Sequence, residues 1–552
     1  MAAPHGPDTG RPPTRADRAM VTSPHTLASG AGVDVLRRGG SAVDAMIAVN
    51  AVLCVVYPHM AGLGGDGFWL IADPDGEVAG LNASGPAAQA ATRDYYRERG
   101  HTDEIPVRGP LAAVTVPGAV DGWRLAHERY GRLPWSELFD DAVHYARHGA
   151  PVGRSLADWL VDDLAMLTAQ ETTARIFAPN GRAAVRGERL RQAELARTFE
   201  TLAADGARKG FYEGDLARRF CAALEPGGSP LRSGDFAEYQ AHWEEPLSTD
   251  YRGHTVYQLP PNTQGFTALQ IINLVEGYDV GAWGDDTPDY YHHLAEVVKL
   301  AFSDRDEWLT DKHWVDIPLT ELLSKRYADQ RRQLVRSDRS MVMEEVEPGL
   351  KFRAGADRRS PAGDTCAFSV ADADGMVVSA IQSIYHDFGC AVVAGDTGVI
   401  PQNRGSFFSL DDRHVNTMEP GKRTFHTLIP GLAFRDGRPW LAYGSMGGEG
   451  QPQTGIALLT RLIDFGYDVQ QAIEAPRWLM GRTWGETDRD LSLEGRISDE
   501  TVRDLKRRGQ PVQMLPDWDD NVGHAQAIRL DPDNGFLESG ADPRGDGAAI
   551  GF

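Results

Sequence analysis

The chain contains 552 residues, which at roughly 150 residues per domain allows three or four domains or one very large domain. Its formal net charge of -23 argues against nucleic acids and anionic membrane surfaces as partners, because both are bound by clusters of Lys and Arg. Hydrophobic residues account for 41% and charged residues for 24%, which is typical of a folded chain with a large core.

Residues 1–19 are polar and lack the apolar segment that drives secretion, so we expect a disordered leader and a cytoplasmic protein. The four cysteines form no CxxC pair, which indicates free thiols in a reducing compartment. No run reaches about 18 apolar residues, so no membrane span is predicted.

In chain order, residues 23–40 predict a first helix that ends at Gly39-Gly40. The apolar run 41–57 predicts a second and largely buried helix. Residues 67–84 then change to a strand pattern with a turn at Asp75-Gly76. This first part of the chain therefore combines buried helices with a hairpin.

Residues 118–335 are mostly helical in pattern, and residues 336–361 are charged and aperiodic, which indicates a mobile surface stretch. Two hairpins follow, at 366–385 and 428–445, and then helices over 454–479 and a strand pair near the C-terminus. Runs of strands flanked by runs of helices predict an α+β fold in which stacked sheets are covered by helices.

Several familiar site motifs are absent or out of context. Residues 62–67 match the GxGxxG pattern of dinucleotide sites, but an apolar helix precedes them and a strand follows, which reverses the required order. We predict a tight structural turn there instead. His292 and His293 have no companion metal motif, and the chain has no GxSxG elbow. The sequence thus predicts neither a cofactor nor a metal.

A candidate nucleophile lies in Gly363-Asp364-Thr365, where the long polar stretch meets a buried-looking strand. If the chain is cut before Thr365, the new α-amine has an ordinary pKa of roughly 7.7 to 8.0 and can act as base for its own hydroxyl. About 80 residues later, a glycine-rich loop containing Gly447 and Gly448 follows a predicted strand. Adjacent glycine amides of this kind can stabilise an oxyanion.

Several long motifs occur in the order typical of one enzyme family. They are MVTSPHTLASGAGVDVLRRGGSAVDAMIAV, YPHMAGLGGDGF, VTVPGAVDGWRLAHERYGRLPW, FYEGDLARRF, DTCAFSVADADG and the closing GADPRGDGAAIGF. Over residues 20–552 the chain resembles the γ-glutamyltranspeptidase family of N-terminal nucleophile (Ntn) hydrolases. The resemblance implies a four-layer αββα sandwich built by a large segment, 20–364, and a small catalytic segment, 365–552, that remain associated after self-cleavage.

The resemblance also implies roles for individual residues. Thr365 matches the catalytic threonine, which cleavage after Asp364 creates. Ser383 matches a second hydroxyl that hydrogen-bonds the amine of the nucleophile, and Gly447 and Gly448 match the oxyanion loop. The sequence leaves open whether the mature protein is a homo-oligomer.

The anchors that hold a γ-glutamyl substrate are missing. The stretch 81–88 lacks the family's carboxylate-binding Arg, Phe407 stands near the acidic amine anchor, and His426-Thr427 replace paired serines. A γ-glutamyl group would lose its charge partners at both ends, at a cost of several kcal/mol. Arg404 falls where the amine-binding segment begins, so a bidentate clamp for a substrate carboxylate is predicted there.

The divergent stretches that contain Tyr385, Arg404, His426 and Thr427 resemble instead a branch that includes oxamate amidohydrolases and carbon–carbon hydrolases of lincomycin and pyrrolobenzodiazepine biosynthesis. We take these four residues as candidate substrate contacts. The first hypothesis is an amidohydrolase for a small carboxylate-bearing substrate. The alternatives are a carbon–carbon hydrolase that releases an oxalyl unit, a glutathione hydrolase, and an unprocessed scaffold protein.

Overall fold

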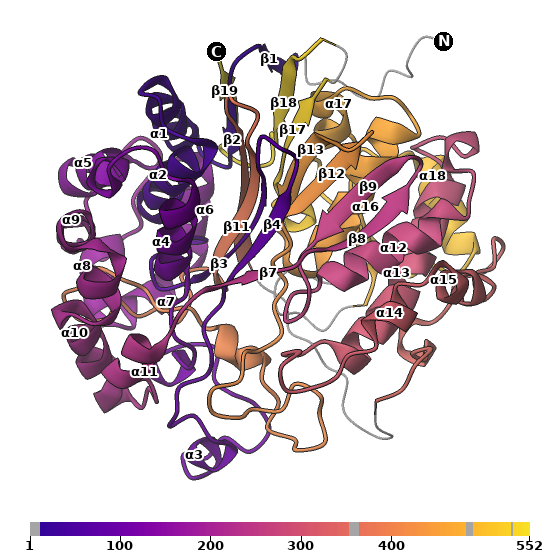
Figure 1. The fold of residues 1–552 in the computed structure, drawn as a ribbon. Helices are drawn as coiled ribbons and strands as arrows, with labels where there is room; N and C mark the ends of the chain where they lie inside the picture. The colour runs from indigo at the N-terminus through magenta and orange to yellow at the C-terminus, as the bar shows by residue number, and fades with distance from the viewer. Residues whose placement is uncertain (1–10, 353–363, 482–488, 532–533) are drawn as a thin grey trace.

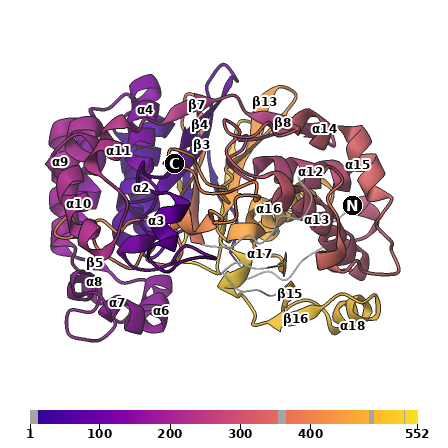
Figure 2. The same ribbon diagram turned by 90° about the horizontal axis from the view of Figure 1, so that it is seen from below.

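The computed structural model describes residues 11–352, 364–481, 489–531 and 534–552. Two seven-stranded sheets stack face to face at its centre, and helices cover the outer face of each sheet (Figure 1). Figure 2 shows the same layers from below, with one group of helices on each side of the paired sheets. The structure is therefore the α+β, four-layer αββα sandwich that the resemblance implies.

Both sheets mix strands from the two sides of residue 364. One sheet has the order β1 (Thr14–Ala16), β18 (Leu537–Ala541), β17 (Ala525–Leu530), β13 (Arg438–Ser445), β12 (Gly431–Arg435), β9 (His254–Gln258), β8 (Leu247–Tyr251). The other has the order β19 (Ala548–Gly551), β2 (Met20–Ser23), β10 (Asp364–Ala371), β11 (Val377–Tyr385), β3 (Asp66–Ala72), β4 (Val78–Ala83), β7 (His242–Glu244). The segments before and after Asp364 therefore build one unit.

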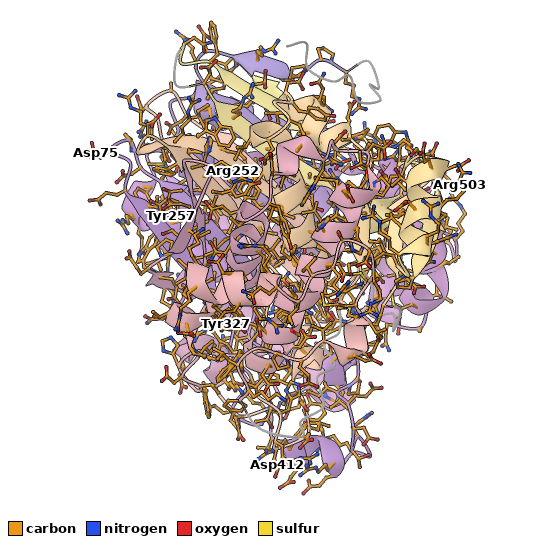
Figure 3. All side chains as sticks on the ribbon, turned by 90° about the vertical axis from the view of Figure 1, so that its right-hand side faces the viewer. Asp75, Arg252, Tyr257, Tyr327, Asp412 and Arg503 are labelled. Atoms are coloured by element: carbon orange, nitrogen blue, oxygen red, sulfur yellow. The ribbon has the colours of Figure 1, made fainter. Side chains whose placement is uncertain are left out.

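Each sheet has its own helical layer. The β10 sheet is covered by α1 (Thr26–Arg37), α2 (Ala42–Val56), α4 (Ala119–Tyr130), α5 (Asp140–His148), α9 (Ala193–Ala207). The β13 sheet is covered by α12 (Gly265–Glu276), α13 (Pro288–Trp308), α16 (Gln451–Ile463), α17 (Val469–Glu474). Charged side chains such as Arg252, Asp412 and Arg503 project from the outer surface (Figure 3).

Smaller elements complete the fold. The remaining helices are α3 (Arg93–Arg97), α6 (Arg154–Asp162), α7 (Leu164–Thr168), α8 (Glu171–Phe177), α10 (Asp215–Leu224), α11 (Ser233–Glu238), α14 (Leu319–Leu322), α15 (Lys325–Arg332), α18 (Asp499–Arg507). The remaining strands are β5 (Ala150–Pro151), β6 (Arg189–Leu190), β14 (Trp478–Met480), β15 (Leu491–Glu494), β16 (Val512–Leu515).

Burial in the core explains why the predicted second helix and the predicted strands form. Every residue of α2 is buried, and a capping box between Ser41 and Asp44 satisfies backbone donors at its start. Between the sheets, alternating apolar side chains such as Phe68, Leu432 and Ile528 pack into a common core. The buried helix α2 and the three predicted hairpins (67–84, 366–385 and 428–445) thus hold strand β10, which lies inside its sheet, in a fixed position.

Three expectations need correction. The leader predicted over 1–19 is partly ordered, because residues 14–16 form the edge strand β1 beside β18; residues 1–10 lie outside the described residues. The predominantly helical pattern of 118–335 hides three strands over 242–258, which are short and partly polar.

The third correction concerns the stretch 336–361. Its described part, 336–352, is anchored on α13, where Lys299 donates to the carbonyl of Met341 and Glu307 accepts from the backbone of Phe352. Residues 353–361 lie outside the described residues. Within the described part of the chain, no helix has the length and apolar character needed to cross a bilayer.

Candidate active site

Thr365 lies fully buried at the start of the central strand β10. The ladder with β11 pairs Asp364 with Tyr385 and Cys366 with Gln382, so the register shifts at Thr365. This bulge places Thr365 beside the segment that contains Ser383 on the neighbouring strand. The extra residue lies on β11, where Ser383 and Ile384 together face Thr365, and bulges of this kind often reorient a side chain next to an active site.

The glycine-rich loop comes close to Thr365 from the other sheet. It follows β13, and its two glycines have positive φ angles, 119° at Gly447 and 50° at Gly448, which only glycine adopts without strain. Three residues further along, the side-chain nitrogen of Gln451 lies 3.3 Å from Thr365 Oγ1. The structure therefore brings the predicted oxyanion loop and the predicted nucleophile together across the two sheets.

Contacts from separate elements hold this loop in place. Gln264 Nε2 donates to the carbonyl of Gly448 at 3.0 Å, and the backbone of Met446 donates to His524 at 3.1 Å. Buried Arg305 pairs with Glu449 at 2.8 Å. A loop held at both ends keeps its amides oriented, as preorganised stabilisation of an oxyanion requires.

Arg404 is completely buried beside Ser383. Its guanidinium donates to Ser383 Oγ at 2.9 Å and to Thr427 Oγ1 at 3.1 Å. Burial lowers the pKa of Arg404 to about 10, although the nearby Tyr385 and Asp66 favour its charged form. Among the described residues, no carboxylate lies within 4.0 Å of this guanidinium, and Arg404 Nε has no hydrogen-bond partner.

Aromatic rings surround the guanidinium on its open faces. Its central carbon lies 4.4 Å from the ring centre of Tyr385 and 5.4 Å from that of Phe407. Phe407 in turn packs at 4.5 Å between Tyr385 and Phe425. These rings stabilise the cation and exclude water from its faces.

His426 is neutral and belongs to a buried dyad with Asp66. The two side chains meet at 3.1 Å between His426 Nε2 and the Asp66 carboxylate. Burial lowers the pKa of His426 well below its ordinary value, and the positive charge of Arg404 acts in the same direction. Asp66 also accepts hydrogen bonds from the backbones of Gly85 and Gly118, yet burial raises its pKa to about 7.

The raised pKa of Asp66 predicts a pH dependence of stability. Between about pH 4 and pH 7 the folded chain retains a proton on Asp66 that the unfolded chain has lost, so stability falls as pH rises, by up to about 1.4 kcal/mol per pH unit. Asp66→Asn removes this titration while keeping the shape. Thermal unfolding from pH 5 to pH 8 should show the wild type losing stability relative to the variant; a difference independent of pH would contradict the assignment.

The residues at the positions where the resemblance expects γ-glutamyl anchors have neutral side chains, although Arg423 Nε donates to the carbonyl of Ser84 at 3.0 Å. Asn82 and Ser84 form a hydrogen-bonded group with Asn262, at 3.0 Å and 3.2 Å from its side chain. Phe407 lies in the aromatic stack and offers no negative charge to an amine. The structure therefore contains neither of the expected γ-glutamyl charge partners at these positions.

Sequence reasoning missed Gln451, Gln264 and Asp66. A glutamine carries no distinctive motif, and the contact between Gln451 and Thr365 spans 86 residues of sequence. Asp66 lies within the GxGxxG-like segment, for which the sequence predicts only a structural turn. That turn is tight as predicted, because a Cβ on Gly64 would lie 2.0 Å from the carbonyl oxygen of Ile400.

One described group could supply three metal ligands, since donor atoms of His242, Glu244 and His313 lie within 4.8 Å of one another. Glu244 is already paired with Lys312, and Arg423 approaches His242 at 3.4 Å. Two positive side chains at the same donor atoms oppose cation binding, so we assign no metal to this group. His292 hydrogen-bonds the carbonyl of Arg336 at 2.7 Å, as a structural histidine does.

The family model described as gamma-glutamyltranspeptidase matches residues 28–552. The chain belongs to this family. Among curated relatives, it is 47% identical over 536 residues to the glutathione hydrolase-like YwrD proenzyme of Bacillus subtilis, covering 97% of this chain and 98% of the relative. It is 41% identical over 539 residues to the oxamate amidohydrolase proenzyme of Klebsiella pneumoniae, again covering 97% and 98%.

Solved structures agree with this assignment. Cephalosporin acylase from Bacillus halodurans superposes with a TM-score of 0.90 at 35% identity, covering 100% of this chain and 99% of that one. LmbA2991T421A superposes with a TM-score of 0.88 at 30% identity, covering 99% and 100%. The protein is thus an Ntn-type hydrolase of the gamma-glutamyltranspeptidase family, and the proenzyme names of its relatives imply cleavage into two associated fragments.

Proposed function

We propose that the protein is a self-processing amidohydrolase for a short acyl group that carries a carboxylate next to the attacked carbonyl. Cleavage after Asp364 would release the α-amine of Thr365, which then serves as base for its own hydroxyl. The Thr365 oxygen would attack the amide carbon and expel ammonia or an amine. Water would then hydrolyse the acyl-enzyme, with the amides of Gly447 and Gly448 stabilising the oxyanion in both steps.

The observation that carries this proposal is the buried guanidinium of Arg404. It donates to two neutral hydroxyls and lies against aromatic rings, and the nearby Asp66 favours its charge without forming an ion pair with it among the described residues. A buried cation of this kind costs free energy unless a ligand pairs with it. A substrate carboxylate would form two parallel hydrogen bonds with the guanidinium and remove that cost.

The position of Arg404 supports a short acyl group. The guanidinium is one hydrogen bond, 2.9 Å, from Ser383, and the β-ladder places Ser383 beside Thr365. A carboxylate held there lies close to any carbonyl that Thr365 attacks. An oxalyl group, in which carboxylate and carbonyl are directly bonded, fits this spacing. In a γ-glutamyl group the carboxylate is several bonds further from the attacked carbonyl.

A second candidate retains the machinery but breaks a carbon–carbon bond and releases an oxalyl unit. Its support is the resemblance of the stretches that contain Tyr385, Arg404 and His426 to carbon–carbon hydrolases, and the proposed Arg404 clamp would hold an oxalyl unit in either reaction. The leaving group distinguishes the two candidates. Release of ammonia from oxamate supports the amidohydrolase, whereas the second candidate requires a carbon leaving group.

Oxamate and its neutral isostere oxamide test the proposal directly. Each presents the same amide to Thr365, but only oxamate has a carboxylate for Arg404. We expect kcat/KM for oxamate to exceed that for oxamide by roughly 100-fold or more, since a buried charged pair contributes several kcal/mol. Ammonia release measures both reactions. Equal turnover of the two compounds would contradict the proposed carboxylate recognition.

Glutathione should be a poor substrate. Its γ-glutamyl group carries an amine, for which the side chains of Asn82, Ser84 and Phe407 offer no negative charge, and its carboxylate lies far from the attacked carbonyl. Glutamate release should stay at least roughly 100-fold below oxamate hydrolysis in kcat/KM. Efficient turnover of glutathione with a KM below about 1 mM would instead favour the glutathione hydrolase alternative.

A further inference from the structure

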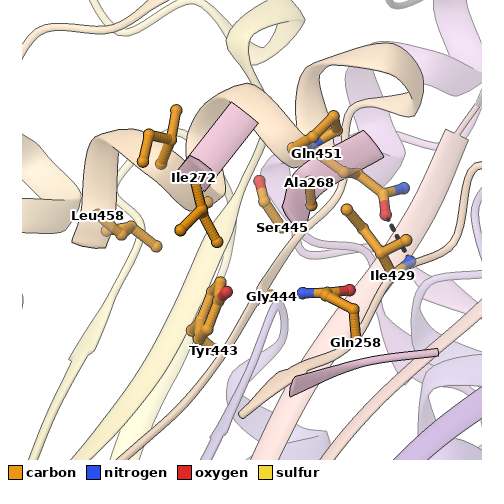
Figure 4. A pocket seen from close by; sticks show the side chains of 12 residues that line it. Gln258, Ala268, Ile272, Ile429, Tyr443, Gly444, Ser445, Gln451 and Leu458 are labelled. Carbon is orange, nitrogen blue, oxygen red and sulfur yellow. Dashed lines mark hydrogen bonds between the residues drawn. The ribbon is translucent and has the colours of Figure 1, made fainter. Parts of the chain in front are cut away.

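Gln451 is buried against the candidate nucleophile, at the first residue of α16. Its side-chain nitrogen lies 3.3 Å from Thr365 Oγ1. Its side-chain oxygen accepts a hydrogen bond of 3.0 Å from the backbone nitrogen of Ile429, which Figure 4 shows as a dashed line. In that view the nitrogen of the amide points away from Ile429.

The bond to Ile429 determines how the amide is oriented. A backbone N–H can only donate, so the atom that faces it must be the amide oxygen of Gln451. The atom that faces Thr365 is then the NH2 group, which can only donate. Thr365 Oγ1 therefore accepts this hydrogen bond.

We propose that Gln451 is a catalytic residue that donates a hydrogen bond to Thr365 Oγ1 during self-cleavage and during turnover. The inference rests on the proposed role of Thr365 as nucleophile. A donor stabilises the oxygen most when it carries negative charge, because hydrogen bonds to charged acceptors are stronger than those to neutral ones. Gln451 would thereby favour the ionised form of the nucleophile.

The same contact acts at two points of the reaction. In acylation the hydroxyl proton passes to the α-amine while the oxygen's electron pair forms the new bond to the carbonyl carbon. The amide carbon–nitrogen bond then breaks, and the ammonium gives that proton to the departing ammonia. In deacylation the α-amine takes a proton from the attacking water, the carbon–oxygen bond breaks with its electron pair returning to the Thr365 oxygen, and the ammonium protonates that oxygen. The oxygen gains negative charge in both events, and Gln451 can stabilise it in each.

The fold supports this role because both ends of the Gln451 side chain are constrained. Its backbone starts α16 directly after the glycine loop, and Ile429 lies just before β12. The side chain therefore spans the two segments with one defined orientation of the amide. A glutamate at this position would keep the bond to Ile429 but, when ionised, could not donate to Thr365.

Two variants separate donation from packing. Gln451→Met keeps the approximate shape without a donor, so kcat for oxamate and the rate of self-cleavage should fall about 10- to 100-fold, with KM little changed. Gln451→Glu should recover as pH falls, because a protonated carboxyl group can donate again. The ratio of its kcat to that of the wild type should therefore rise at low pH, while the ratio for Gln451→Met should stay flat.

Gln192→Met is the matched control, since Gln192 is also a buried glutamine and donates to the carbonyl of Val55 on the opposite side of the β10 sheet. It should lose stability without losing kcat. A kcat for Gln451→Met within about twofold of the wild type, or a Gln451→Glu ratio independent of pH, would overturn the role of Gln451. If Thr365→Ala also stays active, the proposed function fails as well; if Thr365→Ala is inactive, only the inference about Gln451 fails.

Discussion

Thr365→Ala is expected to remain a single chain of 552 residues and to lose amidohydrolase activity by at least roughly 10⁴-fold. The wild type should separate on a denaturing gel into fragments 1–364 and 365–552. Both effects would share one cause, because in the proposed mechanism the Thr365 hydroxyl attacks the preceding peptide bond in the precursor and the substrate in the mature enzyme. A gel of each purified protein, with ammonia release from oxamate, measures both.

Two further variants make this result specific. Thr365→Ser retains a hydroxyl and should still cleave, although more slowly. Thr198→Ala removes another buried hydroxyl, which donates to the carbonyl of Thr397 at 2.7 Å, and should cleave and turn over normally. A wild-type protein that is active as one uncut chain would contradict self-processing, and a folded, uncut and inactive wild type would favour the scaffold alternative.

Arg404→Ala should raise KM for oxamate and lower kcat/KM by roughly 100-fold or more, because truncating one partner of a buried charge pair costs several kcal/mol. Turnover of oxamide should change far less, since it has no carboxylate to pair. Arg404→Lys should also be impaired, because an ammonium group cannot make the bidentate contact. Self-cleavage should continue in both variants, because it needs no substrate. Steady-state kinetics of the two compounds, with a gel, provide the measurement.

Arg461→Lys is the control for the loss of a buried guanidinium. Arg461 is also fully buried, but it donates to the carbonyl of Pro476 on the outer side of the β13 sheet. The Arg461→Lys variant should have altered stability and an unchanged KM for oxamate. If Arg404→Ala weakens oxamate and oxamide turnover equally, Arg404 supports the structure of the site and does not bind a carboxylate.

The elements that the sequence predicted well are those that a local pattern determines. The buried helix α2 and the hairpin of β10 and β11 follow from apolar runs of the right length and from turn residues such as Gly375. The strands over 242–258 were missed because they are short and partly polar, and because β7 and β9 pair with β4 and β12, which lie far away in sequence. Strand β8 pairs with its sequence neighbour β9, in a hairpin that the polar pattern did not reveal. Strand β1 was missed because its stabilising contacts come from residues more than 500 positions later.

The candidate site shows the same limit. The resemblance indicated Thr365 and the glycine loop by their motifs, and lost anchors drew attention to Arg404. The burial of Arg404 and its bond to Ser383 required the fold, since nothing in the local sequence distinguishes it from a surface arginine. Gln451 and Asp66 depend entirely on long-range contacts, because their importance lies in what approaches them in space.

The most direct test of the account is the mass of the small fragment during turnover. Active wild-type protein is mixed with oxamate, quenched in acid and analysed by intact mass and peptide mapping. We predict a fragment whose first residue is Thr365, with an oxalyl group bound to that residue, and no such group on Thr365→Ala. Active protein that begins at another residue, or an acyl group on any other side chain, would contradict the account.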